Sequence, residues 1–282
     1  MNMQQAQKRL EHSLLIHYDE REAAFIADWV MEKCTGRPKI DRVLGKQESL
    51  EESAARSLEK FSQELIAGRP VQYVLNEAWF CGMKLYVDER VLIPRPETEE
   101  LVEWIATDWS GAAPSILDVG TGSGCIPIAL KKRLSRSAIF ACDVSASALA
   151  VARGNAAAHG TGIEFLETNF LDRDQRVLLP SVEVLVSNPP YVPFRDKGAM
   201  AAHVVGFEPH LALFVSDEDP LVFYRNLASF AKERGAASGR LYVEIHEEQA
   251  SGVADILESS GLSEVIVKRD MQGKDRLIKA TW

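Results

Sequence analysis

The sequence predicts an α/β protein in which a small helical bundle precedes a seven-stranded, mostly parallel sheet with helices on both faces. From residue 115 onward, short apolar runs rich in Val and Ile alternate with longer segments of helical pattern, which is typical of β-α-β units. One of these runs leads into a glycine-rich turn that opens a helix. Before residue 68, apolar residues instead recur at three- and four-residue steps, which indicates amphipathic helices.

Composition limits the class of protein. The 282 residues suffice for one large and one smaller domain, and 46% of them are hydrophobic. No apolar run approaches the roughly 20 residues that span a bilayer, and the polar amino terminus has no signal-peptide core. The cysteines show no C-x-x-C spacing, so we expect no metal site and no disulfide framework. A net charge of −9 argues against a main affinity for nucleic-acid backbones. From the cysteines and the polar amino terminus we expect a cytoplasmic protein.

The chain divides into three predicted parts. Residues 1–75 form a helical domain of about four helices, whose role is either recognition of a partner, which we favour, or packing alone. Residues 68–73 break the helical pattern, and residues 76–95 are expected to form a hairpin linker with Gly82 as its turn. Residues 96–282 are assigned to the sheet domain.

A proline-rich strap at residues 92–99 leads into a helix expected at 101–106. The prolines hold the backbone extended, so Arg95 and Glu97 project from a stiff segment. We predict that both side chains contact a substrate; the alternative is an ordinary solvated proline loop. Thr98 or Glu97 is the expected cap of the helix that follows.

The strand predicted at 115–119 runs into a glycine-rich loop and then a helix. Glycine lets the backbone approach a ligand closely, and a helix N-terminus offers free N–H groups. The spacing matches neither the dinucleotide-binding fingerprint nor a P-loop. The candidate ligand-binding residues of this loop are Gly120, Thr121, Gly122, Ser123 and Gly124.

Two further strands end in candidate ligand-binding residues. Asp143 follows the strand at 138–142, where a carboxylate can accept both hydroxyls of a ribose. Asn169 and Phe170 follow the strand at 163–167, where a polar residue and a ring can frame an adenine; the alternative is a plain strand-to-loop turn. Together with the glycine loop, these residues indicate a nucleotide-like ligand.

A Val-rich strand at 184–187 ends abruptly in Asn188, Pro189, Pro190 and Tyr191. The carboxyl ends of such strands are where open α/β sheets bind ligands. An Asn oxygen and a proline-stiffened carbonyl can accept both N–H groups of a planar amide or exocyclic amine, and the tyrosine ring can stack on it. Such a site holds a weakly nucleophilic nitrogen before an electrophile, and it catalyses mainly by proximity and orientation.

Two other features belong to the expected domain. Segment 192–215 is expected to be a long loop, in which we interpret His203 and His210 as surface residues rather than ligands. Gly273 is the expected turn of a terminal antiparallel hairpin.

These residues together resemble the HemK/PrmC family of protein-(glutamine) methyltransferases, which act on peptide chain release factors. The resemblance covers nearly the whole chain. The strap and the carboxyl-terminal segment are its most specific parts, because many methyltransferases share only the glycine loop and Asn-Pro-Pro-Tyr. Its segments are the helical leader and residues 68–73, 92–99, 118–124, 188–191, 208–209, 212–213 and 270–276.

The resemblance implies a Rossmann-like class I methyltransferase sheet that uses S-adenosylmethionine and releases S-adenosylhomocysteine. The acceptor would be the glutamine of a release factor's Gly-Gly-Gln motif. The glycine loop would line the methionine and ribose, Asp143 would take the ribose hydroxyls, and Asn169 and Phe170 would face the adenine. Neither a metal nor a covalent enzyme intermediate is implied.

The resemblance also assigns roles around the acceptor. Asn188 and the backbone of Pro189 would hold the glutamine amide, and Tyr191 would close on it. The implied catalytic residues are Asn188, Pro189 and Tyr191; the substrate-binding residues are these three with Pro190, Arg95 and Glu97; and Asn188 also borders the donor.

Two positions depart from the family pattern. Asn76 stands where a glycine is frequent, which concerns only the linker turn. Asn169 stands where an acid often meets the adenine amine, and an Asn oxygen can accept the same hydrogen bond.

Other acceptors remain compatible with these residues. One is a glutamine of a ribosomal protein, for which the strap would look similar. Another is the exocyclic amine of a nucleic-acid base, which requires base flipping or a single strand and a basic track. A binding module without catalysis is a third alternative, against which the intact site residues argue. We expect release factors as partners, no membrane and no direct nucleic-acid substrate.

Overall fold

A computed structural model describes all residues, 1–282. The chain forms two compact units, one made of residues 1–77 with Ala202–Phe207, the other of Ala78–Ala201 with Glu208–Trp282. The domain limits expected at 75/76 and 95/96 stay predictions. None of the helices combines the length and the apolar character needed to cross a membrane.

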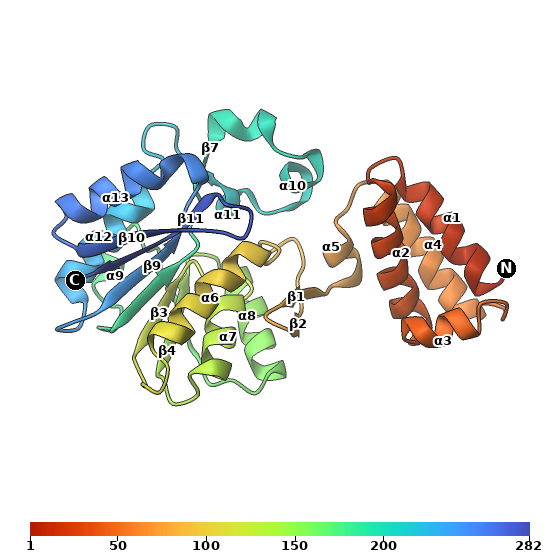
Figure 1. Cartoon of the computed structure of the whole chain (residues 1–282), viewed down its shortest axis with the longest axis horizontal. Helices are drawn as coiled ribbons and strands as arrows, with labels where there is room; N and C mark the ends of the chain where they lie inside the picture. Colours follow the sequence, from red (N-terminus) through yellow and green to blue (C-terminus); the bar gives the residue numbers. More distant parts are fainter. The chain divides into compact units, whose positions relative to one another are not determined.

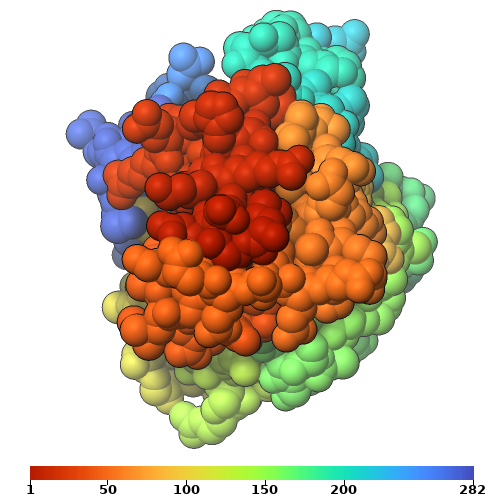
Figure 2. Space-filling model, turned by 90° about the vertical axis from the view of Figure 1, so that its right-hand side faces the viewer, coloured from red at the N-terminus to blue at the C-terminus, as the bar shows by residue number.

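The expected four helices and one more lie in residues 1–77 of the first unit. They are α1 (Met3–Leu14), α2 (Glu20–Thr35), α3 (Lys39–Leu44), α4 (Glu52–Ile66) and the short α5 (Val71–Leu75). Asn2 caps α1 with a reciprocal capping box to Gln5, and Gly36 ends α2 in the left-handed conformation. Leu14, Val30 and Leu65 are among the side chains of one buried core. Figure 2 shows the outer surface of these helices (red to orange).

The break expected at residues 68–73 is shorter than predicted. Gly68, with φ +86°, interrupts the helical structure after α4. Pro70 is the N-cap of α5, so helical structure resumes at Val71. Proline's restricted φ suits the start of a helix, which explains why the pattern restarts there.

The expected hairpin is present in the second unit. β1 (Ala78–Phe80) pairs antiparallel with β2 (Met83–Leu85), with Phe80 opposite Met83. Both residues of the turn, Cys81 and Gly82, have positive φ, as a two-residue type I′ turn requires.

The main sheet has seven strands in the order β10-β11-β9-β6-β3-β4-β5 (Figure 1). The strands are β3 (Ile116–Val119), β4 (Ile139–Asp143), β5 (Glu164–Glu167), β6 (Val184–Ser187), β9 (Arg240–Glu244), β10 (Ser263–Arg269) and β11 (Asp275–Thr281). The five strands from β9 to β5 are parallel, whereas β11 pairs antiparallel with both β9 and β10. The predicted fold class is confirmed, including the terminal hairpin with Gly273 at φ +84° in its turn.

Helices cover both faces of the sheet (Figure 1). They are α6 (Pro96–Asp108), α7 (Cys125–Arg133), α8 (Ala146–Ala158), α9 (Arg173–Arg176), α12 (Val222–Arg234), the 3-10 turn η2 (Glu247–Gln249) and α13 (Ala250–Ser259). One buried core joins α6 and α7 to the sheet and the other joins α12 and α13 to it. The central strands β3 and β6 are buried along their whole length, because apolar side chains meet a helix layer on each side.

The sequence predicted one long loop at residues 192–215, and this prediction is wrong. It contains β7 (Val192–Pro193), the 3-10 helix η1 (Phe194–Ala199), α10 (Ala202–Phe207), α11 (His210–Leu213) and β8 (Phe214–Val215). β7 and β8 pair in parallel, so the segment closes on itself. These elements are too short for a periodic pattern to be detected in the sequence. His203 and His210 are exposed, as expected.

Candidate active site

A pocket of about 830 Å³, its open mouth included, lies at the carboxyl ends of the central strands. In the parallel register, Val119 of β3 is level with Cys142 of β4 and with Ser187 of β6. The residues that follow these strands therefore emerge at one edge of the sheet. Chain order reverses beside β3, and such switch points are where open α/β sheets bind ligands.

The glycine loop forms the floor of the pocket. Gly120 and Gly122 line it, with φ of +75° and +53°, and a Cβ on either would meet no atom within 4 Å. Gly124 serves packing instead: at φ +80° it is the N-cap of α7, and a Cβ there would approach the Ala152 Cβ to 3.2 Å. The loop thus needs glycine both for its backbone conformation and for close packing of α7 on α8.

The other two residues of the loop do not reach the pocket. Thr121 and Ser123 are buried, and neither residue lines the pocket. Contact of these two residues with a ligand stays a prediction.

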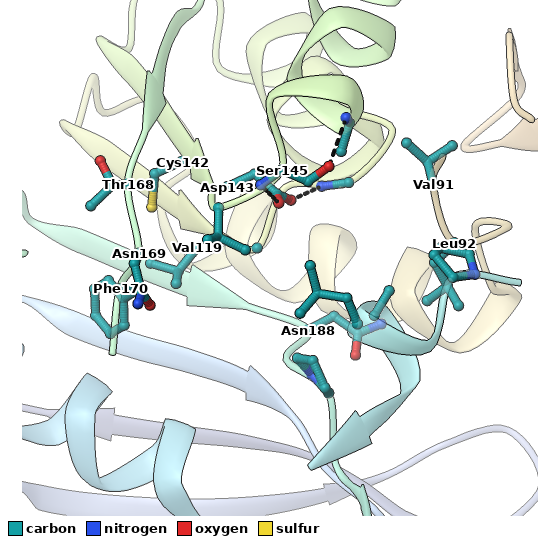
Figure 3. A pocket seen from close by; sticks show the side chains of 18 of the residues that line it. Val91, Leu92, Val119, Cys142, Asp143, Ser145, Thr168, Asn169, Phe170 and Asn188 are labelled. Atoms are coloured by element: carbon teal, nitrogen blue, oxygen red, sulfur yellow. Dashed lines mark hydrogen bonds between the residues drawn. The ribbon is translucent and has the colours of Figure 1, made fainter. Parts of the chain in front are cut away.

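Asp143 occupies the pocket wall at the end of β4 (Figure 3). Its Oδ2 accepts from the Gly122 N–H at 2.9 Å, and its Oδ1 accepts from the Ser145 N–H at 2.9 Å. Burial raises the pKa of this carboxyl, whereas the backbone donors lower it. Each carboxylate oxygen has more than one lone pair, so both can still accept a ligand hydroxyl.

Asn169 and Phe170 lie across from Leu92 of the strap and from Val91, which precedes it (Figure 3). The Asn169 oxygen accepts from the Leu171 N–H at 3.1 Å, which orients the side chain. The Phe170 ring belongs to the buried core, although part of the residue lines the pocket. The wall they form is mainly apolar, which suits a flat aromatic ligand.

Asn188 enters the pocket from the end of β6, together with Pro190 (Figure 3). Its Nδ2 donates to the Thr98 hydroxyl at 3.1 Å. Pro189 is buried and Tyr191 is half-buried, and neither lines the pocket. Tyr191 instead donates to Glu244 Oε1 at 3.4 Å, so its ring is held beside the asparagine loop.

Glu244, at the end of β9, is 1% exposed and was not predicted as a site residue. Burial raises its pKa to about 7, while the hydrogen bond from Thr98 and the charge of Arg276 oppose the rise. A single acidic residue in the apolar run of this strand was the sequence signal, since a carboxylate is rarely buried without partners.

The expected cap of α6 is wrong. The helix begins at Pro96 with Arg95 as its N-cap, and no side chain caps it. Proline at the first helical position has no N–H to satisfy, so the helix starts two residues before Thr98. Thr98 lies inside the helix, 2% exposed, and its hydroxyl donates to Glu244 Oε2 at 2.6 Å.

The strap is held by a buried carboxylate from the Phe207–Glu208–Pro209 turn. Glu208 accepts from Arg95 Nη2 at 2.6 Å and from the Ile93 N–H at 3.2 Å, and its side chain is 1% exposed. Arg95 therefore secures the wall of the pocket, where the sequence predicted a substrate contact. Glu97 lies half-buried in the first turn of α6, where the helix dipole favours an acid.

Comparisons with known proteins agree with this geometry. The model of the methyltransferase small domain matches residues 96–207, and the model of the PrmC N-terminal domain matches residues 3–75. The release factor glutamine methyltransferase of Flavobacterium psychrophilum is 38% identical over 94% of both chains. That of Bacteroides thetaiotaomicron is 37% identical over 96% of this chain and 97% of its own.

A solved structure supports the fold. The methyltransferase from Pyrococcus furiosus superposes with a TM-score of 0.53 at 16% identity, covering 80% of this chain and 96% of its own. The fold is that of a class I α/β methyltransferase. More specifically, the chain belongs to the family of release factor glutamine methyltransferases.

A buried acid beneath the glycine loop gives a pH-dependent prediction. Asp118 is 0% exposed, and burial raises its pKa to about 7; a hydrogen bond from Thr121 opposes the rise and the charge of Asp143 adds to it. Between about pH 4 and 7 the native state holds this proton more tightly than the unfolded chain. Stability is therefore lost as the pH rises through that window, by up to about 1.4 kcal/mol per unit.

We expect Asp118→Asn to remove this slope and to be more stable than the wild type at pH 8. Urea unfolding at pH 5, 6, 7 and 8 measures the difference, in which the contribution of Glu244 cancels. Parallel pH profiles for the two proteins would contradict the prediction.

The strap gives a second prediction. Glu208→Ala leaves Arg95 and the Ile93 N–H without their acceptor, and we expect the free energy of unfolding to fall by about 2–4 kcal/mol. Glu103→Ala is the matched control, because Glu103 is 60% exposed in its ion pair with Arg133 and should cost less than about 1 kcal/mol. Equal losses in urea unfolding would show that the buried clasp has no special weight.

Proposed function

We propose that this protein transfers a methyl group from S-adenosylmethionine to the side-chain amide nitrogen of the glutamine in the Gly-Gly-Gln motif of peptide chain release factors. The observation that carries the proposal is that Asp143 and Asn188, a ribose acceptor and an amide acceptor, face one pocket from strands on either side of β3. The choice of acceptor rests on the relatives, which are named release factor glutamine methyltransferases. Such an enzyme would work in the cytoplasm, where release factors act.

The residues present fit the donor. Gly120 and Gly122 leave open space where a Cβ would stand, which admits a ligand close to the backbone. Asp143 would hold the ribose hydroxyls, and Asn169 and Phe170 would border the adenine. Bound here, S-adenosylmethionine would supply an electrophilic methyl group on its sulfonium.

The acceptor side needs hydrogen-bond acceptors rather than a strong base. The Oδ1 of Asn188 has no partner within the chain, and the Pro189 carbonyl precedes a second proline that stiffens it. Together they would accept the two amide N–H groups and turn the nitrogen lone pair toward the methyl group. As the methyl group bonds to the nitrogen and leaves the sulfur, the nitrogen becomes acidic and one of its protons leaves late, to water. Tyr191, held by Glu244, would close on the planar amide. Positioning of this kind supplies most of the catalysis, up to about 7–11 kcal/mol in the best cases.

A methyl-transfer assay tests the acceptor. Purified release factor, ribosomal proteins and RNA are offered separately with labelled S-adenosylmethionine, and mass spectrometry locates the methyl group. We expect methylation of the Gly-Gly-Gln glutamine and none of RNA. A methyl group found only on RNA or only on a ribosomal protein would refute the proposal.

Asn188→Ala tests the site. The variant loses one of two acceptors for the amide, and we expect turnover to fall by at least about 100-fold. Donor affinity, measured by calorimetry, should stay within about threefold because Asp143 and the glycine loop are intact. Unchanged turnover with unchanged donor binding would remove Asn188 from the mechanism.

A further inference from the structure

A hydroxyl and a carboxylate stand directly behind the asparagine of the site. Thr98 donates its only hydroxyl proton to Glu244 Oε2 at 2.6 Å, and the two residues are 2% and 1% exposed. The same hydroxyl oxygen accepts from Asn188 Nδ2 at 3.1 Å. The three side chains therefore form a directed chain of hydrogen bonds from Asn188 through Thr98 to Glu244.

The direction of this chain has a chemical consequence. A threonine hydroxyl has one proton and two lone pairs. While the Glu244 carboxylate is ionised, the hydroxyl proton is committed to it, so Thr98 can only accept from its other neighbour. The amide of Asn188 must then present nitrogen to Thr98 and oxygen to the opposite side. If Thr98 were free to donate, the flipped amide would be equally satisfied, with its nitrogen in the place of the acceptor.

We propose that Glu244 and Thr98 are positioning residues that fix the orientation of the Asn188 amide, so that its Oδ1 faces the acceptor amide in the pocket. The proposal rests on the function proposed above, in which Asn188 accepts from the glutamine N–H. A reversed Asn188 amide would place its NH2 group against the NH2 group of the substrate glutamine. Two donor groups cannot hydrogen-bond to each other, so the substrate nitrogen would be pushed from its reactive position.

The surroundings of Glu244 hold its carboxylate in place. Tyr191 donates to its Oε1 at 3.4 Å, and Tyr224 donates to its backbone carbonyl at 3.1 Å. Arg276 of β11 lies close enough for its charge to lower the pKa of Glu244, and it donates to Asp270 at 3.4 Å and to the Ile245 carbonyl at 3.2 Å. The strap, β9 and the terminal hairpin thus converge behind one loop.

Kinetics of Thr98 variants test the arrangement. Thr98→Val keeps the shape but removes the hydroxyl, and we expect kcat for release factor methylation to fall about 10- to 100-fold with KM changed less than about threefold. Thr98→Ser restores the hydroxyl and should recover at least half of the wild-type kcat. Thr107→Val, an exposed threonine of the same helix, is the control and should behave as the wild type.

Glu244 supplies the second arm. In Glu244→Leu the Thr98 proton is free to turn to Asn188, so we expect a loss of kcat as large as in Thr98→Val. The double variant should be no worse than either single variant by more than about threefold, because the residues act as a unit. Wild-type kcat in Thr98→Val, failure of Thr98→Ser to recover activity, or additive losses would overturn the proposal.

A third measurement does not depend on the acceptor. The Asn188 side-chain amide is identified in a ¹⁵N–¹H spectrum by its absence in Asn188→Asp. We expect its protons to exchange slowly with water in the wild type and in Thr98→Ser, and at least about 10-fold faster in Thr98→Val. Equal exchange rates in all three proteins would refute the proposed hydrogen-bond chain from Asn188 through Thr98 to Glu244, even if release factors are methylated. Slow exchange with no methylation of release factors would instead refute only the proposed function.

Discussion

The parallel register of β3, β4 and β6 is the constraint on which the site depends. Val119, Cys142 and Ser187 are level with one another, so the glycine loop, Asp143 and Asn188 emerge at the same edge. The register itself follows from burial on both faces, because a slip of one residue would exchange the side chains of the two helix layers. The residues of a pocket assembled in this way need not be neighbours in the sequence.

Buried carboxylates concentrate around this edge. Glu208 secures the strap, Glu244 holds the Thr98 hydroxyl, and Asp118 lies beneath the glycine loop. Burying a carboxylate costs free energy unless partners compensate, so such residues persist where they serve a purpose. Glu208 and Glu244 have partners on different elements, and each joins segments far apart in the chain to the pocket wall.

The pocket has two sides with different requirements. Around Asp143, backbone N–H groups and glycines make a rigid, closely fitting wall. Around Asn188, side chains from α6 and β9 set the direction of one amide. The first side suits recognition of a donor and the second suits orientation of an acceptor.

The sequence alone determined the fold class, the family and several of the pocket residues. Strand runs, glycine positions and Asn-Pro-Pro-Tyr express local requirements, and these are visible in the chain itself. Gly120, Asp143, Asn169 and Asn188 were all predicted and all line the pocket.

Only the tertiary structure decided what the intervening polar residues do. Arg95 was expected to contact substrate and pairs with Glu208, and Thr98 was expected to cap α6 and instead joins Asn188 to Glu244. These partners lie more than 80 residues apart, as Asn188 and Thr98 show with a separation of 90. A hydrogen bond between such residues depends on how the strap packs on the sheet, and no local pattern in the sequence encodes that distance.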